Sequence, residues 1–234
     1  EHSALGKALE QAAQLGLFEH GQDNIELLVE DTRATKEGGE KAAKRALDQG
    51  AQILLGPLFS DAVTGATLLA TKAHVPLIAF SNNKAVARAG IYTLGFDPSQ
   101  QIERVIRFAS ANGLKRITAY LPQNPDGHLT QEVLARLQKE GVSEIVKTTF
   151  YDPASPGTLS VNTPSSTQAI LIPEGGQALS RIVSALLYHD HGADKYRLLG
   201  SGQWDGPGVW SDPHLVGGWF AAPTPGGRVA FEKE

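Results

Sequence analysis

The sequence predicts an α/β protein built on a mainly parallel sheet with helices on both faces. Three observations lead to this fold class. Strand-like and helix-like segments alternate along the 234 residues, and the connections between them are only a few residues long. Several strand-like runs are continuously apolar, as in ILLG, LIAF and AILI. Regular alternation is typical of βαβ units, and continuous apolar runs are typical of strands buried on both faces.

The first part of the chain opens with an amphipathic pattern over residues 4–20. Leu5, Leu9 and Leu17 fall near one face of the predicted helix, and Gly21 ends it. The expected elements that follow are a strand at 25–31, a helix at 37–49, a strand at 52–55, a helix at 61–73, and strands at 75–80 and 91–96.

The second part begins with a helical pattern over residues 99–112, which Asn112 and Gly113 close. A segment rich in Pro, Ser and Thr, residues 152–166, interrupts the alternation. The other expected elements are a strand at 116–121, a helix at 128–141, strands at 144–151 and 169–173, a helix at 178–192, and strands at 197–201 and 217–223.

Composition excludes several classes of protein. The net charge of −4 argues against binding to nucleic acid or anionic membranes, which requires basic patches. No apolar run approaches the roughly 18 residues of a membrane helix. The chain has no cysteine, so disulfides, thiolate metal sites and cysteine nucleophiles are excluded. It also has no Walker A sequence, no G-x-G-x-x-G after a strand and no G-x-S-x-G elbow, so no cofactor is expected.

Small polar residues end the predicted strands abruptly. In an open parallel sheet, ligands bind outside the carboxyl ends of the strands, where helix N-termini also offer unpaired N–H groups. Capping of the following helix is the alternative role, which Ser and Asp favour. Because the pattern recurs after several strands, we expect these residues to form a ligand site. The candidates are Ser60, Asp61, Ser81, Asn82, Asn83, Asn124, Asp126, Glu174, Gln203 and Trp204.

Two features have competing interpretations. The run Tyr188-His189-Asp190-His191-Gly192 has metal-ligand residue types, but polar and cationic residues at a helix C-terminus explain it better, so no metal site is expected. Trp204 could stack on a ligand from a strand end, although tryptophan more often packs in a core.

The order of these elements resembles the type 1 periplasmic-binding-protein fold, in its Leu/Ile/Val-binding-like branch. The motifs that carry this resemblance are Gly56-Pro57-Leu58-Phe59-Ser60, Pro76 to Ser81, and the crossover from Tyr92 to Pro98. The chain is also similar to bacterial lipoproteins that activate penicillin-binding proteins. The matching segments are LGPLFSDAV, VPLIAFSNN, IYTLGFDPSQQIERV, LIPEGG, LLGSGQWD and GGWFAAP.

The resemblance implies two α/β lobes with a ligand in the cleft between them. Residues 1–97 would form the first lobe, residues 98–200 the second, and residues 201–234 a return toward the first. It also implies a first strand before Glu1 and further helices after Glu234.

In amino-acid-binding relatives, the loops that match Ser60-Asp61 and Ser81-Asn83 hold the ligand carboxylate. An acid from the loop matching residues 201–205 holds the ammonium. Here that loop offers Gln203 and Trp204, with the acid displaced to Asp205, which leaves an α-amino-acid clamp an open question.

The leading functional hypothesis is therefore a non-enzymatic periplasmic protein that stimulates a peptidoglycan synthase by contact. By resemblance it would sit on an outer-membrane lipid anchor outside this chain. The alternative is a solute-binding receptor of an ABC importer for amino acids or similar ligands, working by hinge closure and contacting an ABC permease. The small ligand would be amino acid-like or derived from peptidoglycan. A DNA regulator's ligand-sensing core and an enzyme on a doubly wound sheet are weaker alternatives.

Overall fold

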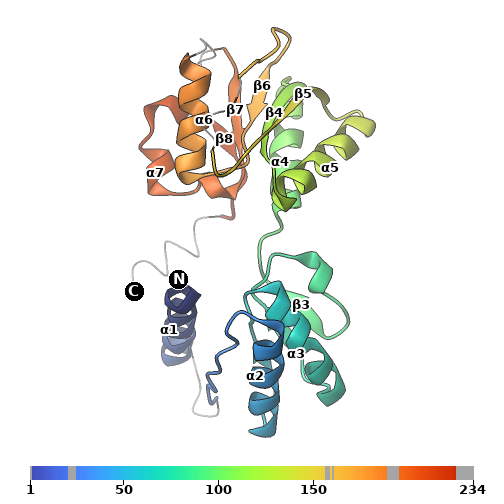
Figure 1. Ribbon diagram of the computed structural model, residues 1–234, viewed down its shortest axis with the longest axis vertical. Coiled ribbons are helices and arrows are strands. Elements are labelled where there is room, and N and C mark those ends of the chain that lie inside the picture. The colour runs from blue at the N-terminus through green and yellow to red at the C-terminus, as the bar shows by residue number, and fades with distance from the viewer. Residues whose placement is uncertain (1, 21–24, 156–158, 160, 189–194, 225–234) are drawn as a thin grey trace. The chain divides into compact units, whose positions relative to one another are not determined.

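The computed structural model describes residues 2–20, 25–155, 159, 161–188 and 195–224. The chain divides into two compact units, Glu1–Asp97 and Pro98–Glu234, each of which is described here by itself (Figure 1).

The first unit contains a three-stranded parallel sheet in the order β1-β2-β3. Its elements are α1 (His2–His20), α2 (Lys36–Asp48), β1 (Leu54–Leu55), α3 (Ser60–Ala73), β2 (Leu77–Ala79), the 3-10 helix η1 (Lys84–Val86) and β3 (Ile91–Thr93). The predicted α/β alternation is thus confirmed, with strands shorter than expected.

Glycines allow α2 and α3 to pack closely. A Cβ atom on Gly65 would lie 1.9 Å from the Lys36 carbonyl oxygen, and one on Gly39 would lie 2.2 Å from that of Ala62. Both distances are far inside van der Waals contact, so only glycine fits at these positions. Together with β2 and β3, the two helices enclose the core of this unit. This packing holds the N-terminus of α3, and with it Ser60, beside the strand ends.

The prediction of a strand at residues 25–31 is wrong. Residues 25–31 are irregular and pair with no strand, and Ile25 is 57% and Val29 55% exposed. An apolar run indicates strand propensity, but a strand forms only where a neighbour accepts its backbone hydrogen bonds.

The second unit contains a five-stranded parallel sheet in the order β5-β4-β6-β7-β8. Its main elements are α4 (Pro98–Ala111), β4 (Arg116–Pro122), α5 (Pro125–Lys139), β5 (Glu144–Tyr151), β6 (Ala169–Leu171), α6 (Gly176–Tyr188), β7 (Arg197–Gly200) and β8 (Trp219–Phe220). Three short helices, η3 (Gly202–Trp204), α7 (Pro207–Trp210) and η4 (Pro213–Leu215), lie between β7 and β8.

Helices cover both faces of this second sheet, as predicted (Figure 1). Along β4, the side chains of Ile117, Ala119 and Leu121 belong to the core formed with α4 and α5. Tyr120 belongs to the opposite core, formed with α6. Burial on both faces explains why these strands are continuously apolar.

The described residues 201–224 pack in the second unit, contrary to the expected return toward the first. β8 extends the second sheet, with Trp219 opposite Leu199. The Trp219 ring also meets Phe108 edge-on at 5.0 Å, and the Arg197 guanidinium lies 4.8 Å above it.

The part of the predicted Tyr188–Gly192 cluster from residue 189 onward lies outside the described residues. Among the described helices, none is both long and apolar enough to cross a membrane.

Candidate functional site

The predicted site residues lie at the carboxyl edges of the two sheets. Ser60, Ser81 and Asn83 follow β1 and β2 in the first unit. Asn124, Glu174 and the 201–204 segment follow β4, β6 and β7 in the second unit.

In the first unit, three of the candidates form one hydrogen-bonded group, which we call the Ser60–Ser81–Asn83 trio. The two serine hydroxyl oxygens are 3.3 Å apart. The Asn83 side-chain amide donates to the Ser60 hydroxyl oxygen at 3.2 Å, and the Asn83 backbone N–H donates to the Ser81 hydroxyl oxygen at 3.1 Å. Residues 21 positions apart in sequence therefore converge on one point.

The trio has one more hydroxyl proton than its internal hydrogen bonds use. Each serine hydroxyl has one proton, and the contact between Ser60 and Ser81 uses only one of the two. Whichever serine donates, the other keeps an O–H group that has no acceptor among the hydrogen bonds of the described residues. Ser60 is also the first residue of α3, whose opening N–H groups have no acceptor within the helix. The trio thus presents donors, the arrangement that an anion such as a carboxylate requires.

The other two candidates of this unit contribute differently. Asp61 lies exposed in the first turn of α3, where its charge complements the helix dipole. Asn82 is exposed, and its backbone packs against Gly95, where a Cβ atom would lie 2.5 Å from the Asn82 nitrogen. In the hydrogen bonds of the described residues, neither side chain joins the trio.

Asn124 in the second unit is a helix cap. Its side-chain oxygen accepts from the Gly127 N–H at 2.9 Å, which fixes the start of α5. Asp126 lies exposed in the first turn of the same helix.

The 201–204 segment is hydrogen-bonded to the end of β6 and the loop that follows it. The side-chain oxygen of Gln203 accepts from the Gly175 N–H at 3.1 Å. The Trp204 indole N–H is shared between the carbonyl oxygens of Ile172 (3.1 Å) and Glu174 (2.9 Å). Because Trp204 is only 1% exposed, the expectation that its ring stacks on a ligand does not fit, and the ring is part of the core.

Glu174 lies near enough to Asp126 for the charge of one carboxylate to act on the other. Burial raises the pKa of the Glu174 carboxyl, and the nearby Asp126 carboxylate adds to this effect. The pKa of Tyr151 is also raised, first by burial and then by the charge of Glu174. Tyr151 was not predicted, because nothing in the sequence around the end of β5 indicates a ligand role, and its nearness to Glu174 depends on the tertiary structure.

The described residues contain no group of three or more His, Asp or Glu side chains that could hold a metal ion.

Comparison with known proteins gives the family. The sequence pattern of a family described as periplasmic binding protein matches residues 2–207. An uncharacterized protein of Rickettsia prowazekii, RP748, is 24% identical over 150 residues, which cover 64% of this chain and 40% of that protein.

Solved structures show the same fold. The leucine-binding protein LivK of Thermotoga maritima is 19% identical with a TM-score of 0.63, covering 100% of this chain and 73% of that one. A Rhodopseudomonas palustris ABC-transporter solute-binding protein, in complex with 3,4-dihydroxybenzoic acid, is 16% identical with a TM-score of 0.60, covering 86% of this chain and 58% of that one. LivJ of Streptococcus pneumoniae, in complex with isoleucine, is 18% identical with a TM-score of 0.58, covering 85% of this chain and 60% of that one.

This chain thus spans less than two thirds of the Rickettsia protein and of two of these three solved chains. The family match nevertheless extends over most of its length, and the fold agrees with it. The chain belongs to the periplasmic binding protein family.

Proposed function

We propose that this chain is a non-enzymatic, extracytoplasmic binding protein for a small solute that carries a carboxylate. The observation that carries this proposal is the Ser60–Ser81–Asn83 trio at the strand ends of the first unit. It supplies a free hydroxyl proton beside the N-terminus of α3, and both are donors suited to a carboxylate.

The ligands of the related structures support the same chemistry. Isoleucine and 3,4-dihydroxybenzoic acid, bound in two of them, differ in shape and polarity but share a carboxylate. A first unit that recognises only this shared group is compatible with such variety. Because both relatives are binding proteins of transporters, and the Rhodopseudomonas palustris protein belongs to an ABC transporter, we propose delivery of the solute to an ABC permease as the physiological role.

Contact-based activation of a peptidoglycan synthase, the leading hypothesis from sequence, remains without support among the relatives described above. It would require no ligand at the trio. A binding measurement therefore separates the two hypotheses.

The test is a thermal-shift screen with benzoate, 4-hydroxybenzoate, leucine and isoleucine, using uncharged benzamide as the comparison ligand. A ligand at 100 times its Kd stabilises the folded state by about 2.7 kcal/mol. We expect at least one carboxylate to raise Tm, and Ser60→Ala and Ser81→Ala to abolish that rise.

Thr71→Ala is the matched control, since it removes an exposed hydroxyl from the other end of α3 and should leave the ligand-induced rise intact. Equal shifts for benzamide and benzoate would contradict carboxylate recognition. No shift with any carboxylate, together with capture of a purified peptidoglycan synthase, would favour the activator hypothesis.

A further inference from the structure

The last residues of the first unit, Leu94–Asp97, lie against the loop that carries the trio, and we call them the crossover segment. The Leu94 N–H donates to the Ala79 carbonyl oxygen at 2.8 Å, and the Gly95 N–H donates to the Ser81 carbonyl oxygen at 3.2 Å. A Cβ atom on Gly95 would lie 2.6 Å from the Ser81 carbonyl carbon, so the two backbones are in direct contact. The position of the crossover segment therefore bears on the position of Ser81.

An ion pair joins the crossover segment to η1. The ammonium group of Lys84, the first residue of η1, contacts the Asp97 carboxylate. The Asp97 side chain is only 10% exposed, whereas that of Lys84 is 59% exposed. A largely buried carboxylate is costly without a positive charge beside it. We therefore expect the Asp97 carboxylate to hold the Lys84 side chain, and with it η1, in place.

The position of η1 in turn sets the orientation of the Asn83 side chain. The side-chain oxygen of Asn83 caps η1 by accepting from the Ala85 N–H at 3.0 Å. The nitrogen of the same amide donates to the Ser60 hydroxyl oxygen at 3.2 Å. Because the amide group is planar, a shift of η1 that moves the Ala85 N–H also turns the amide nitrogen away from Ser60.

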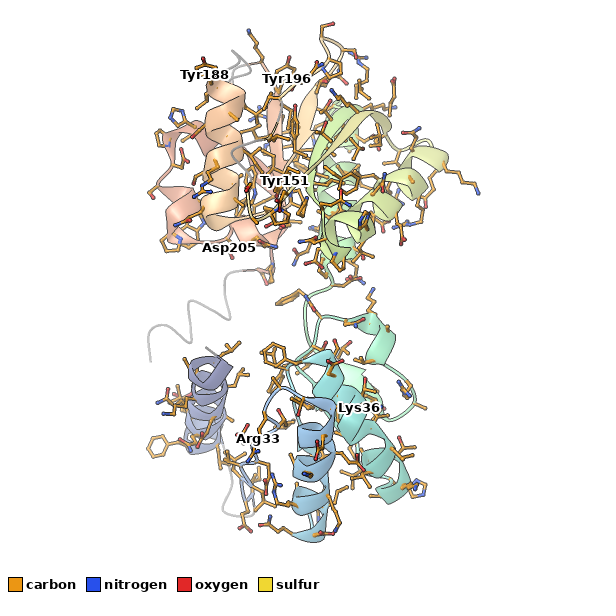
Figure 2. All side chains as sticks on the ribbon, in the orientation of Figure 1. Arg33, Lys36, Tyr151, Tyr188, Tyr196 and Asp205 are labelled. Atoms are coloured by element: carbon orange, nitrogen blue, oxygen red, sulfur yellow. The ribbon has the colours of Figure 1, made fainter. Side chains whose placement is uncertain are left out.

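The chain on the other side of Asp97 is fixed as well. Pro98, the next residue, begins α4, and the side-chain oxygen of Gln101 in the first turn of this helix accepts from the Gly202 N–H at 2.8 Å. Figure 2 shows Asp205, which follows the 202–204 turn, at the end of the second unit where α4 begins. Asp97 thus lies between two hydrogen-bonded stretches of chain and is a firm support for η1.

We infer that Lys84 and Asp97 are positioning residues of the carboxylate site, because their ion pair holds η1 so that Asn83 keeps its hydrogen bond to Ser60. The competing explanation is that Val86 holds η1 alone, since its side chain is 5% exposed and belongs to the core of the first unit. In that case the ion pair is an ordinary structural contact, and its loss would leave the trio unchanged.

This inference rests on the proposed function, because it takes the trio to be the ligand site, so its first test uses the protein without ligand. In an NMR spectrum of ¹⁵N-labelled protein, the side-chain NH₂ group of Asn83 gives its own pair of signals. We expect Asp97→Asn and Lys84→Gln to shift these signals and to speed hydrogen exchange of the Ala85 N–H by about threefold to tenfold. Lys84→Arg keeps the charge and should leave both close to those of the parent protein.

The second test is a calorimetric titration of the full chain with benzoate. Asp97→Asn and Lys84→Gln should each weaken binding by about threefold to tenfold. Since both act through one ion pair, the double variant should bind benzoate no more weakly than Asp97→Asn alone. Asp48→Asn is the matched control, because it removes the carboxylate of an exposed ion pair with Lys44 on α2 and should leave the Asn83 signals and benzoate binding unchanged.

The inference and the proposed function fail in different ways. Absence of benzoate binding to the parent protein would count against carboxylate recognition, and the ligand-free NMR measurement would still decide the role of the ion pair. Unchanged Asn83 side-chain signals in Asp97→Asn would overturn the inference. Equal losses of benzoate affinity in Lys84→Arg and Lys84→Gln, or additive losses in the double variant, would overturn it too.

Discussion

Replacing Gly200 by alanine tests how the strand end of β7 is fixed. A Cβ atom at this position would lie 2.2, 2.3 and 2.5 Å from three atoms of the Trp204 indole ring. The ring cannot easily move away, because it is 1% exposed and its N–H is held by the Ile172 and Glu174 carbonyls.

The magnitude follows from the two ways of relieving this clash. Keeping the ring in place overpacks the core, at about 1–3 kcal/mol. Expelling it loses a buried tryptophan, at about 3–5 kcal/mol. Because three atoms of a firmly held ring would lie within 2.5 Å of the new Cβ atom, we take the upper end of the overpacking cost, about 3 kcal/mol. Alanine recovers roughly 0.5–1 kcal/mol relative to glycine in a strand, so we expect a net destabilisation of about 2–2.5 kcal/mol. For a unit of this size that is a fall in Tm of about 10 °C.

The assay is urea unfolding followed by tryptophan fluorescence. All three tryptophans, Trp204, Trp210 and Trp219, lie in the second unit, so the signal reports on that unit. Gly208→Ala is the control, since a Cβ atom there meets nothing within 4 Å, and it should change stability by less than about 1 kcal/mol. A Gly200→Ala variant as stable as Gly208→Ala would refute this account of the packing.

Two further predictions concern stability. Gly65→Ala should lower the stability of the first unit by about 1–3 kcal/mol or more, because its Cβ atom would lie 1.9 Å from the Lys36 carbonyl oxygen. Amide hydrogen exchange in α2 and α3 measures this loss of stability. Protection equal to that of the parent protein would contradict the prediction. In the second unit, hydrogen bonds from Arg136 and Arg107 lower the pKa of Glu103 to about 2. Since the pKa of Glu103 is lower in the folded state, its ionised carboxylate stabilises the folded protein. This stabilisation is complete above about pH 4.5 and is lost as the pH falls toward 2. In urea unfolding, Glu103→Gln should lose less stability at acid pH than the parent protein does. This difference should shrink in high salt, because the ion pairs of Glu103 with Arg107 and Arg136 are exposed. Equal pH profiles of the two proteins would contradict this role of Glu103.

Most elements of the fold could be predicted because apolar periodicity and capping residues are local signals. Helix α4 and strand β4 follow directly from the pattern of residues 99–121. The strand expected at 25–31 failed because pairing depends on a neighbouring strand, which an apolar run does not reveal. The unit to which residues 201–224 belong was missed for a related reason, since the pairing of β8 with β7 is a tertiary property.

The candidate sites divide in the same way. Ser60, Ser81 and Asn83 could be predicted because the carboxyl ends of parallel strands share an edge, so polar residues that follow them meet. Trp204 could not be assigned to the core or to a ligand, because the choice depends on the space beside Gly200 and Gly218. Tyr151 carried no signal, because a missing hydrogen-bond partner is visible only in the folded chain.

The most direct test of carboxylate binding is a titration of ¹⁵N-labelled protein with benzoate, followed by amide NMR shifts. We expect saturable shifts confined largely to Ser81–Asn83 and the first turn of α3, and we expect Ser81→Ala to abolish them. Shifts centred elsewhere, or the same shifts with benzamide, would contradict the claim that the trio recognises a carboxylate.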